Sequence, residues 1–233
     1  MAIVISEFCT KLIANLTEYC SKTYGYEKYP NQEALSCQTI VNACISTKPD
    51  YVLDIGTNFG ASTLALAFGL KSLGKNLSIL TTIDYDLKHW QKETRLVQKE
   101  LIIEYGIDPT SINGICADFQ SLNPNNFVKS GKALVFYDIH DTLKHSFMTD
   151  FLNKWLPSFS EGSRIMVHDF SAVPKDFISP YKPDPKNPRS RLEHFSGVTF
   201  EGFMEVEILV RWLNERKKQS HGVADTSIMW FDL

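Results

Sequence analysis

The sequence predicts an α/β protein with a doubly wound, mostly parallel sheet covered by helices on both faces. From Tyr51 to Asp169, short apolar segments alternate with longer segments in which apolar residues recur at helical spacing. The short segments are continuous apolar runs, which is typical of parallel strands that are buried on both faces. Strands that alternate with amphipathic helices indicate helical connections between parallel strands.

The composition is that of an ordinary soluble globular protein. The 233 residues include 43% hydrophobic and 22% charged residues, which is enough apolar material for a sizeable core. The formal charge of -3 and the pI of about 6.1 argue against a nucleic-acid or anionic-membrane binder, which would usually be basic. The sequence contains no apolar run of the roughly 20 residues that span a bilayer and no secretory signal pattern. Five cysteines without a CxxC pair favour reduced thiols, so we expect a cytoplasmic protein.

Two helices are expected before the sheet, over residues 1–23 and from Glu33 to about Ser46. Apolar residues recur at helical spacing in both segments, and a glycine and a proline interrupt the pattern between them. We interpret residues 1–48 as an N-terminal helical cap and residues 49–233 as the main domain.

Five strands and their connecting helices follow in order. Parallel strands are expected at Tyr51–Ile55, Leu77–Ile83, Ser111–Cys116, Ala133–Tyr137 and Arg164–Val167. Amphipathic helices are expected near Ala61–Phe68, Trp90–Tyr105, Phe147–Trp155 and Phe203–Leu213, and a closing strand at Ser227–Leu233. The proline-rich stretch at about 171–200 has no periodicity. Because it follows the fifth strand, we expect it to form a lid over the ligand edge of the sheet.

A glycine turn links the first strand to its helix. Gly56 and Gly60 remove side chains where the backbone turns sharply and where a ligand can approach it. The turn leads into a helix N-terminus, whose unpaired N–H groups and dipole favour a polar ligand. The fingerprint for binding a pyrophosphate has a second glycine where this chain has Asn58. We therefore expect a ligand that contains a ribose but no pyrophosphate.

Each of the five expected parallel strands ends in, or just before, an aspartate. These residues are Asp54, Asp84, Asp118, Asp138 and Asp169. Any one of them could be a turn cap, since aspartate favours turns. Five together at the carboxyl edge of a parallel sheet, where ligands bind in open α/β folds, would concentrate negative charge that a ligand or cation must offset.

Taken together, these segments resemble a class I S-adenosylmethionine-dependent methyltransferase, closest to the small-molecule O-methyltransferase branch. The segments are Val52-Leu-Asp-Ile-Gly-Thr-Asn-Phe-Gly60, Asp84, Ala117-Asp118, Phe136-Tyr-Asp-Ile-His140 and Met166-Val-His-Asp169. The resemblance extends from about Tyr51 to Asp169. It implies a Rossmann-like fold and S-adenosylmethionine as the cofactor.

The resemblance also implies the cofactor-binding residues. Those in and near the glycine turn are Asp54, Gly56, Thr57, Asn58, Gly60 and Ser62, joined by Asp138 at the fourth strand. Those near the adenosine are Asp84, Tyr85, Asp118 and Phe119. Asp84 would accept hydrogen bonds from the ribose hydroxyls, and Asp118 would bind the adenine amino group. For Phe119, an ordinary core position is an equal alternative to stacking beside the adenine.

The catalytic residues are expected at the ends of the fourth and fifth strands, and two arrangements are open. In the first, Asp138, Asp169 and His168 bind Mg²⁺ or another divalent cation, which lowers the pKa of the acceptor hydroxyl. In the second, His140 or His168 acts as a general base and a neighbouring aspartate fixes its tautomer. Phe170 stands where catechol-type metal-dependent enzymes have asparagine, which argues against their metal site.

We predict a methyltransferase that methylates a hydroxyl of a small molecule. The Asn/Asp-Pro-Pro-Tyr/Phe motif of amino-methylating enzymes is absent at the fourth strand, where Tyr137-Asp-Ile-His140 stands. Two alternatives are a non-catalytic binding or assembly protein on the same fold, and a cephalosporin-hydroxylase-like oxidation enzyme that uses iron. We expect no nucleic-acid or membrane partner, and a homodimer is left open.

Overall fold

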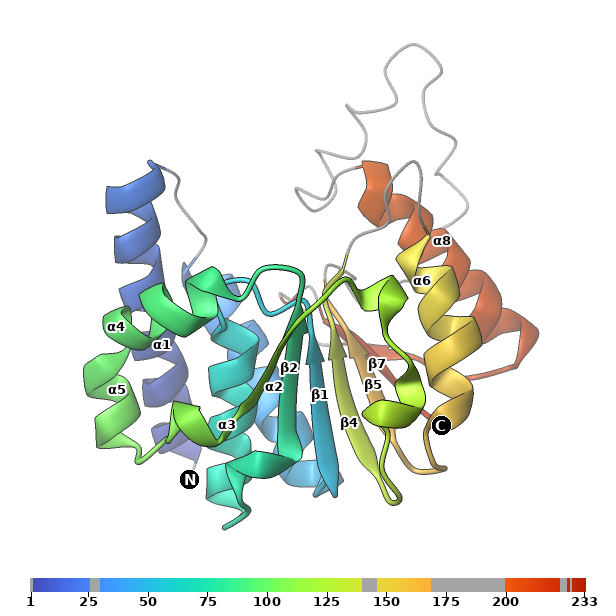
Figure 1. The fold of residues 1–233 in the computed structure, drawn as a ribbon, viewed down its shortest axis with the longest axis horizontal. Helices are drawn as coiled ribbons and strands as arrows, with labels where there is room; N and C mark the ends of the chain where they lie inside the picture. Colours follow the sequence, from blue (N-terminus) through green and yellow to red (C-terminus); the bar gives the residue numbers. More distant parts are fainter. Residues whose placement is uncertain (1, 26–29, 140–145, 169–199, 223–225, 227) are drawn as a thin grey trace.

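The strands form one mixed sheet in the order β3-β2-β1-β4-β5-β7-β6 (Figure 1). The computed structural model describes residues 2–25, 30–139, 146–168, 200–222, 226 and 228–233. The strands are β1 Tyr51–Ile55, β2 Leu80–Asp84, β3 Asn113–Cys116, β4 Ala133–Tyr137, β5 Arg164–Val167, β6 His221–Gly222 and β7 Met229–Asp232. Strands β1 to β5 run parallel to their neighbours, and β7 runs antiparallel to both β5 and β6. The doubly wound, mostly parallel sheet that the sequence predicts is therefore confirmed.

Helices cover both faces of the sheet. The α-helices are α1 Ala2–Tyr24, α2 Pro30–Thr47, α3 Ala61–Ser72, α4 Arg95–Val97, α5 Lys99–Glu104, α6 Phe147–Asp150 and α8 Phe200–Glu215. Two π-helical turns, at His89–Thr94 and Phe151–Trp155, precede α4 and follow α6. Helices α1 to α5 lie on one side of the sheet, and α6 and α8 lie on the other (Figure 1).

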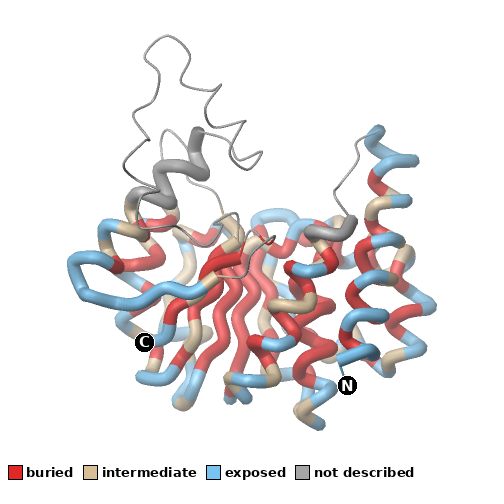
Figure 2. The backbone as a smooth tube through the Cα atoms, turned by 180° about the vertical axis from the view of Figure 1, so that it is seen from behind, coloured by how far each residue is buried: buried red, intermediate tan, exposed pale blue. Residues whose placement is uncertain are grey.

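Alternating side chains of the central strands supply two separate cores. Val52 and Phe136 pack into a cluster with buried residues of α1, α2 and α3, whereas Leu53 and Val135 pack into a cluster with α6 and α8. This alternation places every residue of β1 and β4 in a buried position, as Figure 2 shows for the centre of the sheet. The continuous apolar runs of the sequence are explained by this two-sided burial.

Several elements differ from the expected ones. The third strand begins at Asn113 instead of Ser111, and the helix expected at Phe147–Trp155 is divided into α6 and a π-helical turn. The second strand begins at Leu80 because residues 77–79 form a 3₁₀ turn, and the side chain of Asn76 caps that turn by accepting a hydrogen bond from the N–H of Ser78. The helix expected at Trp90–Tyr105 is divided into a π-helical turn and two short helices. The expected closing strand is present as β7, and it pairs antiparallel with an additional short strand, β6. The expected lid at about 171–200 lies, apart from Phe200, outside the described residues.

Within the described ranges, no helix combines the length and the apolar character that crossing a bilayer would require.

Candidate functional site

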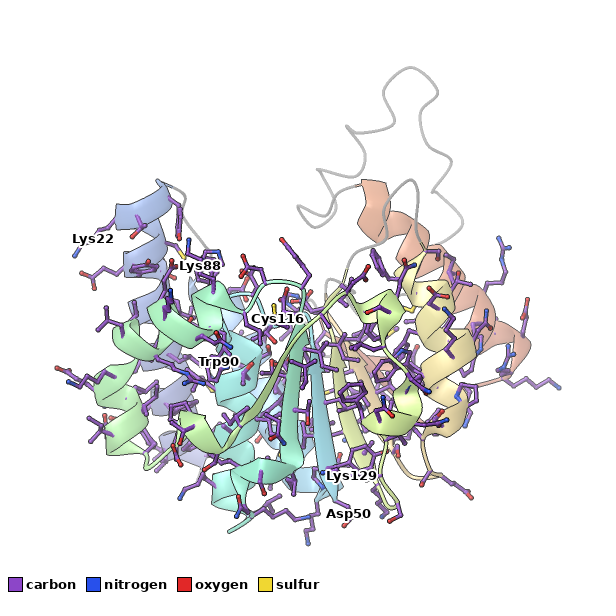
Figure 3. All side chains as sticks on the ribbon, in the orientation of Figure 1. Lys22, Asp50, Lys88, Trp90, Cys116 and Lys129 are labelled. Atoms are coloured by element: carbon purple, nitrogen blue, oxygen red, sulfur yellow. The ribbon has the colours of Figure 1, made fainter. Side chains whose placement is uncertain are left out.

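A cleft of about 660 Å³ opens at the carboxyl edge of the parallel strands. Cys116, at the end of β3, marks this edge in Figure 3, and Asp50 and Lys129, which precede β1 and β4, mark the opposite edge. The cleft is lined by Gly56, Asn58, Ile83, Asp84, Tyr85, Asp86, His89, Ala117, Asp118, Phe119, Asp138, Ile139 and Phe147. The ends of β1, β2, β3 and β4 thus contribute to one site, as ligand binding at this edge of α/β sheets requires.

The glycine turn forms one wall of the cleft. Its backbone enters the left-handed region at alternate residues, with φ of 93° at Gly56, 44° at Asn58 and 73° at Gly60. Asparagine is one of the few residues that tolerate this region, which explains how Asn58 replaces the glycine of the dinucleotide fingerprint. A Cβ on Gly56 would lie 2.2 Å from the carbonyl oxygen of Asp138. The turn therefore packs directly against the end of β4, and only glycine fits there.

Asp84 presents a fixed carboxylate to the cleft. Its Oδ2 accepts a hydrogen bond of 2.8 Å from the N–H of Asn58, and its Oδ1 accepts one of 3.2 Å from the N–H of Asp86. Each carboxylate oxygen has a second lone pair that can accept a further hydrogen bond. Asp84 can therefore receive ligand hydroxyl groups without moving.

Another wall of the cleft is formed by the residues that follow β3. Asp118 is exposed, and its carboxylate caps the turn at Phe119–Ser121 by accepting from the N–H of Gln120 at 3.0 Å. The ring of Phe119 is buried and stacks on Trp155 with 4.8 Å between ring centroids. The core position of Phe119 is thus confirmed, although the residue also lines the cleft. Tyr85, which directly follows β2, also lines the cleft and is 82% exposed.

A second, smaller cavity of about 90 Å³ adjoins the cleft on the side of α1 and α2. Thr57 and Ser62 line it, so the N-terminus of α3 contributes to its wall. Asn58 and Asp138 line both the cleft and the second cavity. A ligand in the cleft can therefore extend past these two residues toward a helix N-terminus.

Asp138 and His168 form a pair beside this junction. The Oδ1 of Asp138 lies 3.2 Å from the Nδ1 of His168, and the two side chains are 24% and 16% exposed. Backbone hydrogen bonds fix both residues, because the N–H of Asp138 donates to Ile55 and that of His168 donates to Tyr137. An ionised carboxylate only accepts, so Nδ1 carries the proton and Nε2 is the basic nitrogen of the ring.

Asp54 occupies a different position from Asp84, Asp118 and Asp138. It is an interior residue of β1, is fully buried and lines neither cavity. Its Oδ2 accepts hydrogen bonds from the hydroxyls of Thr63 and Thr82, which tie α3 and β2 to β1. Burial disfavours the charged form and raises the pKa of Asp54 to about 6. The expectation that Asp54 stands at the sheet edge is wrong, and its part in cofactor binding stays a prediction.

Replacing Asp54 by asparagine is expected to remove a pH-dependent cost to stability. Because the pKa is raised in the folded state, the folded protein binds more protons than the unfolded chain between about pH 4 and pH 6. Wild-type stability therefore falls as the pH rises through this window, by on the order of 3 kcal/mol. Urea unfolding of ligand-free protein should show the Asp54→Asn variant gaining on wild type by this amount from about pH 4 to pH 7. A difference that stays constant over this range would contradict the assignment.

Two of the expected catalytic residues, His140 and Asp169, lie outside the described residues. Of the three expected metal ligands, the structure places Asp138 and His168 together. Among the residues that it describes, no cluster of three or more His, Cys, Asp or Glu side chains could hold a metal ion. The metal site stays a prediction.

One residue at the cleft, His89, was not singled out by the sequence. It lines the cleft from the π-helical turn that follows β2. Its position five residues after Asp84 was the only available indication, because the segment after a strand end borders the ligand edge.

The strand order and the cleft define a class I methyltransferase fold. A family model described as "Methyltransferase domain" matches residues 53–170, slightly more than half of the chain. The chain belongs to this methyltransferase-domain family, and the resemblance to class I methyltransferases is confirmed. No curated protein matched the chain in a sequence comparison.

Solved structures share the fold at low sequence identity. The methyltransferase PaMTH1 of Podospora anserina, bound to SAH, is 14% identical with a TM-score of 0.55, over 94% of this chain and 87% of that one. The O-methyltransferase TomG of Streptomyces achromogenes, in complex with SAM, is 15% identical with a TM-score of 0.51, over 86% and 79%. CalS11, a TDP-rhamnose 3′-O-methyltransferase, is 12% identical with a TM-score of 0.53, over 99% and 93%.

Proposed function

We propose that this methyltransferase uses S-adenosylmethionine and methylates a hydroxyl group of a small molecule. The observation that carries the proposal is the fixed Asp84 carboxylate beside a glycine turn at the carboxyl edge of the sheet. Two solved structures that share the fold contain SAM or SAH, which supports this cofactor.

The two cavities fit the parts of this cofactor. The cleft has the volume of a small-molecule site and offers Asp84 for the ribose hydroxyls and Asp118 for the adenine amino group. The second cavity has room for an amino-acid tail, and the positive end of the α3 dipole, with the Ser62 hydroxyl, favours its carboxylate. Asp138, at the junction, offers negative charge near the sulfonium and ammonium groups.

The Asp138–His168 pair supplies the base that a hydroxyl acceptor needs. The cofactor, when bound, supplies an activated methyl group. As the new C–O bond forms, the hydroxyl must lose its proton, and the Nε2 of His168 would accept it. Asp138 would hold the Nδ1–H and stabilise the positive charge that the ring gains.

A hydroxyl acceptor is favoured over an amino group by this base. A neutral amine is already a good nucleophile. A hydroxyl is a weak nucleophile, and it becomes a good one when a base removes its proton. TomG and CalS11, which share the fold, are named as O-methyltransferases. These observations support hydroxyl methylation.

Calorimetry with S-adenosylhomocysteine tests the cofactor assignment. We expect wild-type protein to bind it, and Asp84→Asn to weaken binding by about tenfold to a hundredfold, because a hydrogen bond to a charged group is lost. Asp108→Asn is a matched control. Asp108 also accepts from a backbone N–H, that of Thr110, but its turn precedes β3 and lies away from the cleft. Failure of the wild-type protein to bind either S-adenosylmethionine or S-adenosylhomocysteine would overturn the proposal.

A further inference from the structure

A chain of hydrogen bonds joins the end of α1 to the cleft. The hydroxyl of Tyr24 donates to the Oε2 of Glu93 at 3.0 Å, and the same oxygen lies 2.7 Å from the Nδ1 of His89. Tyr24 is the last residue of α1, whereas Glu93 and His89 belong to the π-helical turn after β2. Two segments that are far apart in the sequence thus meet beside the cleft.

Aromatic contacts hold the same residues together. The ring of His89 lies 4.4 Å from that of Phe59 and 6.1 Å from that of Tyr24, measured between centroids. Phe59 belongs to the glycine turn and lines the second cavity, while His89 lines the cleft. The side chains of His89 and Glu93 are 30% and 20% exposed, so this pair is partly shielded from water. The imidazole is therefore held in place by Glu93, Phe59 and Tyr24, and it also lines the cleft.

The partners of His89 define its tautomer. The hydrogen bond from His89, with further hydrogen bonds from Tyr24 and Tyr19, holds the pKa of Glu93 below its usual value. The carboxylate is therefore ionised and can only accept, which assigns the proton to Nδ1 of the imidazole. Nε2 is then the ring nitrogen that can accept a hydrogen bond from a ligand.

His89 offers a ribose an acceptor beside the carboxylates of Asp84 and Asp86, which line the same cleft. The 2′ and 3′ hydroxyls of a ribose each bring one proton. Because the two oxygens of Asp84 each receive a backbone N–H group, Nε2 of His89 can share these hydroxyls with the remaining lone pairs of Asp84. Among the described residues that line the cleft, His89 alone has a basic side chain.

We propose that His89 is a binding residue for the cofactor ribose, and that Glu93 and Tyr24 are positioning residues that orient its ring. This inference rests on the proposed function, since it assigns a further contact at the same cofactor site. The three residues make the end of α1 part of the cofactor site.

Calorimetry with S-adenosylhomocysteine and 5′-methylthioadenosine tests this role, because the second ligand has the adenosine but lacks the amino-acid tail. His89→Phe keeps an aromatic ring against Phe59 and removes both nitrogens. It is expected to weaken the binding of both ligands by about tenfold, the effect of one hydrogen bond. Glu93→Gln is expected to weaken both by about threefold to tenfold, and Tyr24→Phe by a smaller factor in the same direction.

A double-mutant cycle distinguishes an effect of Glu93 that acts through His89 from a general effect on the structure. If Glu93 acts through His89, Glu93→Gln should have no further effect on affinity in a His89→Phe background. Glu18→Gln is the matched control for Glu93→Gln. Glu18 lies on α1, the helix that ends at Tyr24, and it pairs with Lys22 on the exposed surface. Thermal unfolding without ligand should show that each variant is folded at the assay temperature.

Three results would overturn the inference while leaving the proposed function intact. They are unchanged affinity of His89→Phe, a loss confined to S-adenosylhomocysteine, and equal effects of Glu93→Gln with and without His89. Failure of the wild-type protein to bind either ligand would instead count against the proposed function, on which this role depends.

Discussion

Replacing Gly56 by alanine is expected to abolish cofactor binding and to lower the free energy of unfolding by at least about 3 kcal/mol. Two effects combine at this position. The backbone has a φ of 93°, which a side chain opposes, and the new Cβ would lie 2.2 Å from the carbonyl oxygen of Asp138. Since that oxygen belongs to the backbone, the end of β4 must move, and the wall of the cleft must move with it.

Gly74→Ala separates these two effects. Gly74 also has a positive φ, of 68°, but a Cβ there would meet no atom within 4 Å. This control should lose only about 1–2 kcal/mol, the cost of the left-handed backbone, and should bind S-adenosylhomocysteine like wild type. Urea unfolding and calorimetry measure both quantities. Equal losses in the two variants would show that the contact with Asp138 has no importance.

Replacing His168 by glutamine is expected to lower the rate of methyl transfer by about a hundredfold to ten-thousandfold, the usual contribution of a general base. Affinity for S-adenosylhomocysteine should remain within about threefold of wild type, because glutamine can still bond to Asp138 and fills a similar space. A selective loss of rate is expected because the base acts on the acceptor hydroxyl, which S-adenosylhomocysteine does not have.

Release of S-adenosylhomocysteine from S-adenosylmethionine, in the presence of a panel of small phenols and sugars, measures this rate. His221→Gln is the control, since His221 is exposed and stacks on Trp230 in the β6–β7 hairpin, away from both cavities. If His168→Gln transfers methyl groups as fast as wild type to an acceptor that wild type accepts, His168 is not the base.

The parts of the fold that could be predicted are those that depend on residue type and on neighbours in the sequence. The apolar runs of β1 and β4 show two-sided burial directly, and Gly56 and Gly60 mark a turn because few other residues adopt its backbone. The burial of the Asp54 side chain could not be read in this way. Its carboxylate lies inside the fold because the hydroxyls of Thr63 in α3 and Thr82 in β2 donate to it, and that meeting depends on how α3 and β2 pack against β1.

The same limit applies to the site. The closeness of Asp138 and His168 follows from the parallel pairing of β4 with β5, which the strand pattern predicts. The position of His89 depends on a π-helical turn, whose wider winding leaves no periodic pattern in six residues. Strand β6 has only two residues, too few for any period. Features set by distant pairing or by short irregular turns are therefore the ones that the sequence leaves undetermined.

The cysteines provide a means of observing ligand entry without a mutation. Cys116 is exposed at the end of β3, and its Sγ lies 3.3 Å from the carbonyl oxygen of Tyr85, on the wall of the cleft. The other four thiols are buried, and burial raises the pKa of Cys9 and Cys44 to about 12, where they are poor nucleophiles. A thiol-directed fluorophore would thus attach to the native sequence beside the cleft, next to Tyr85. Its emission would report occupancy of the cleft in real time, without the need for a methyl acceptor.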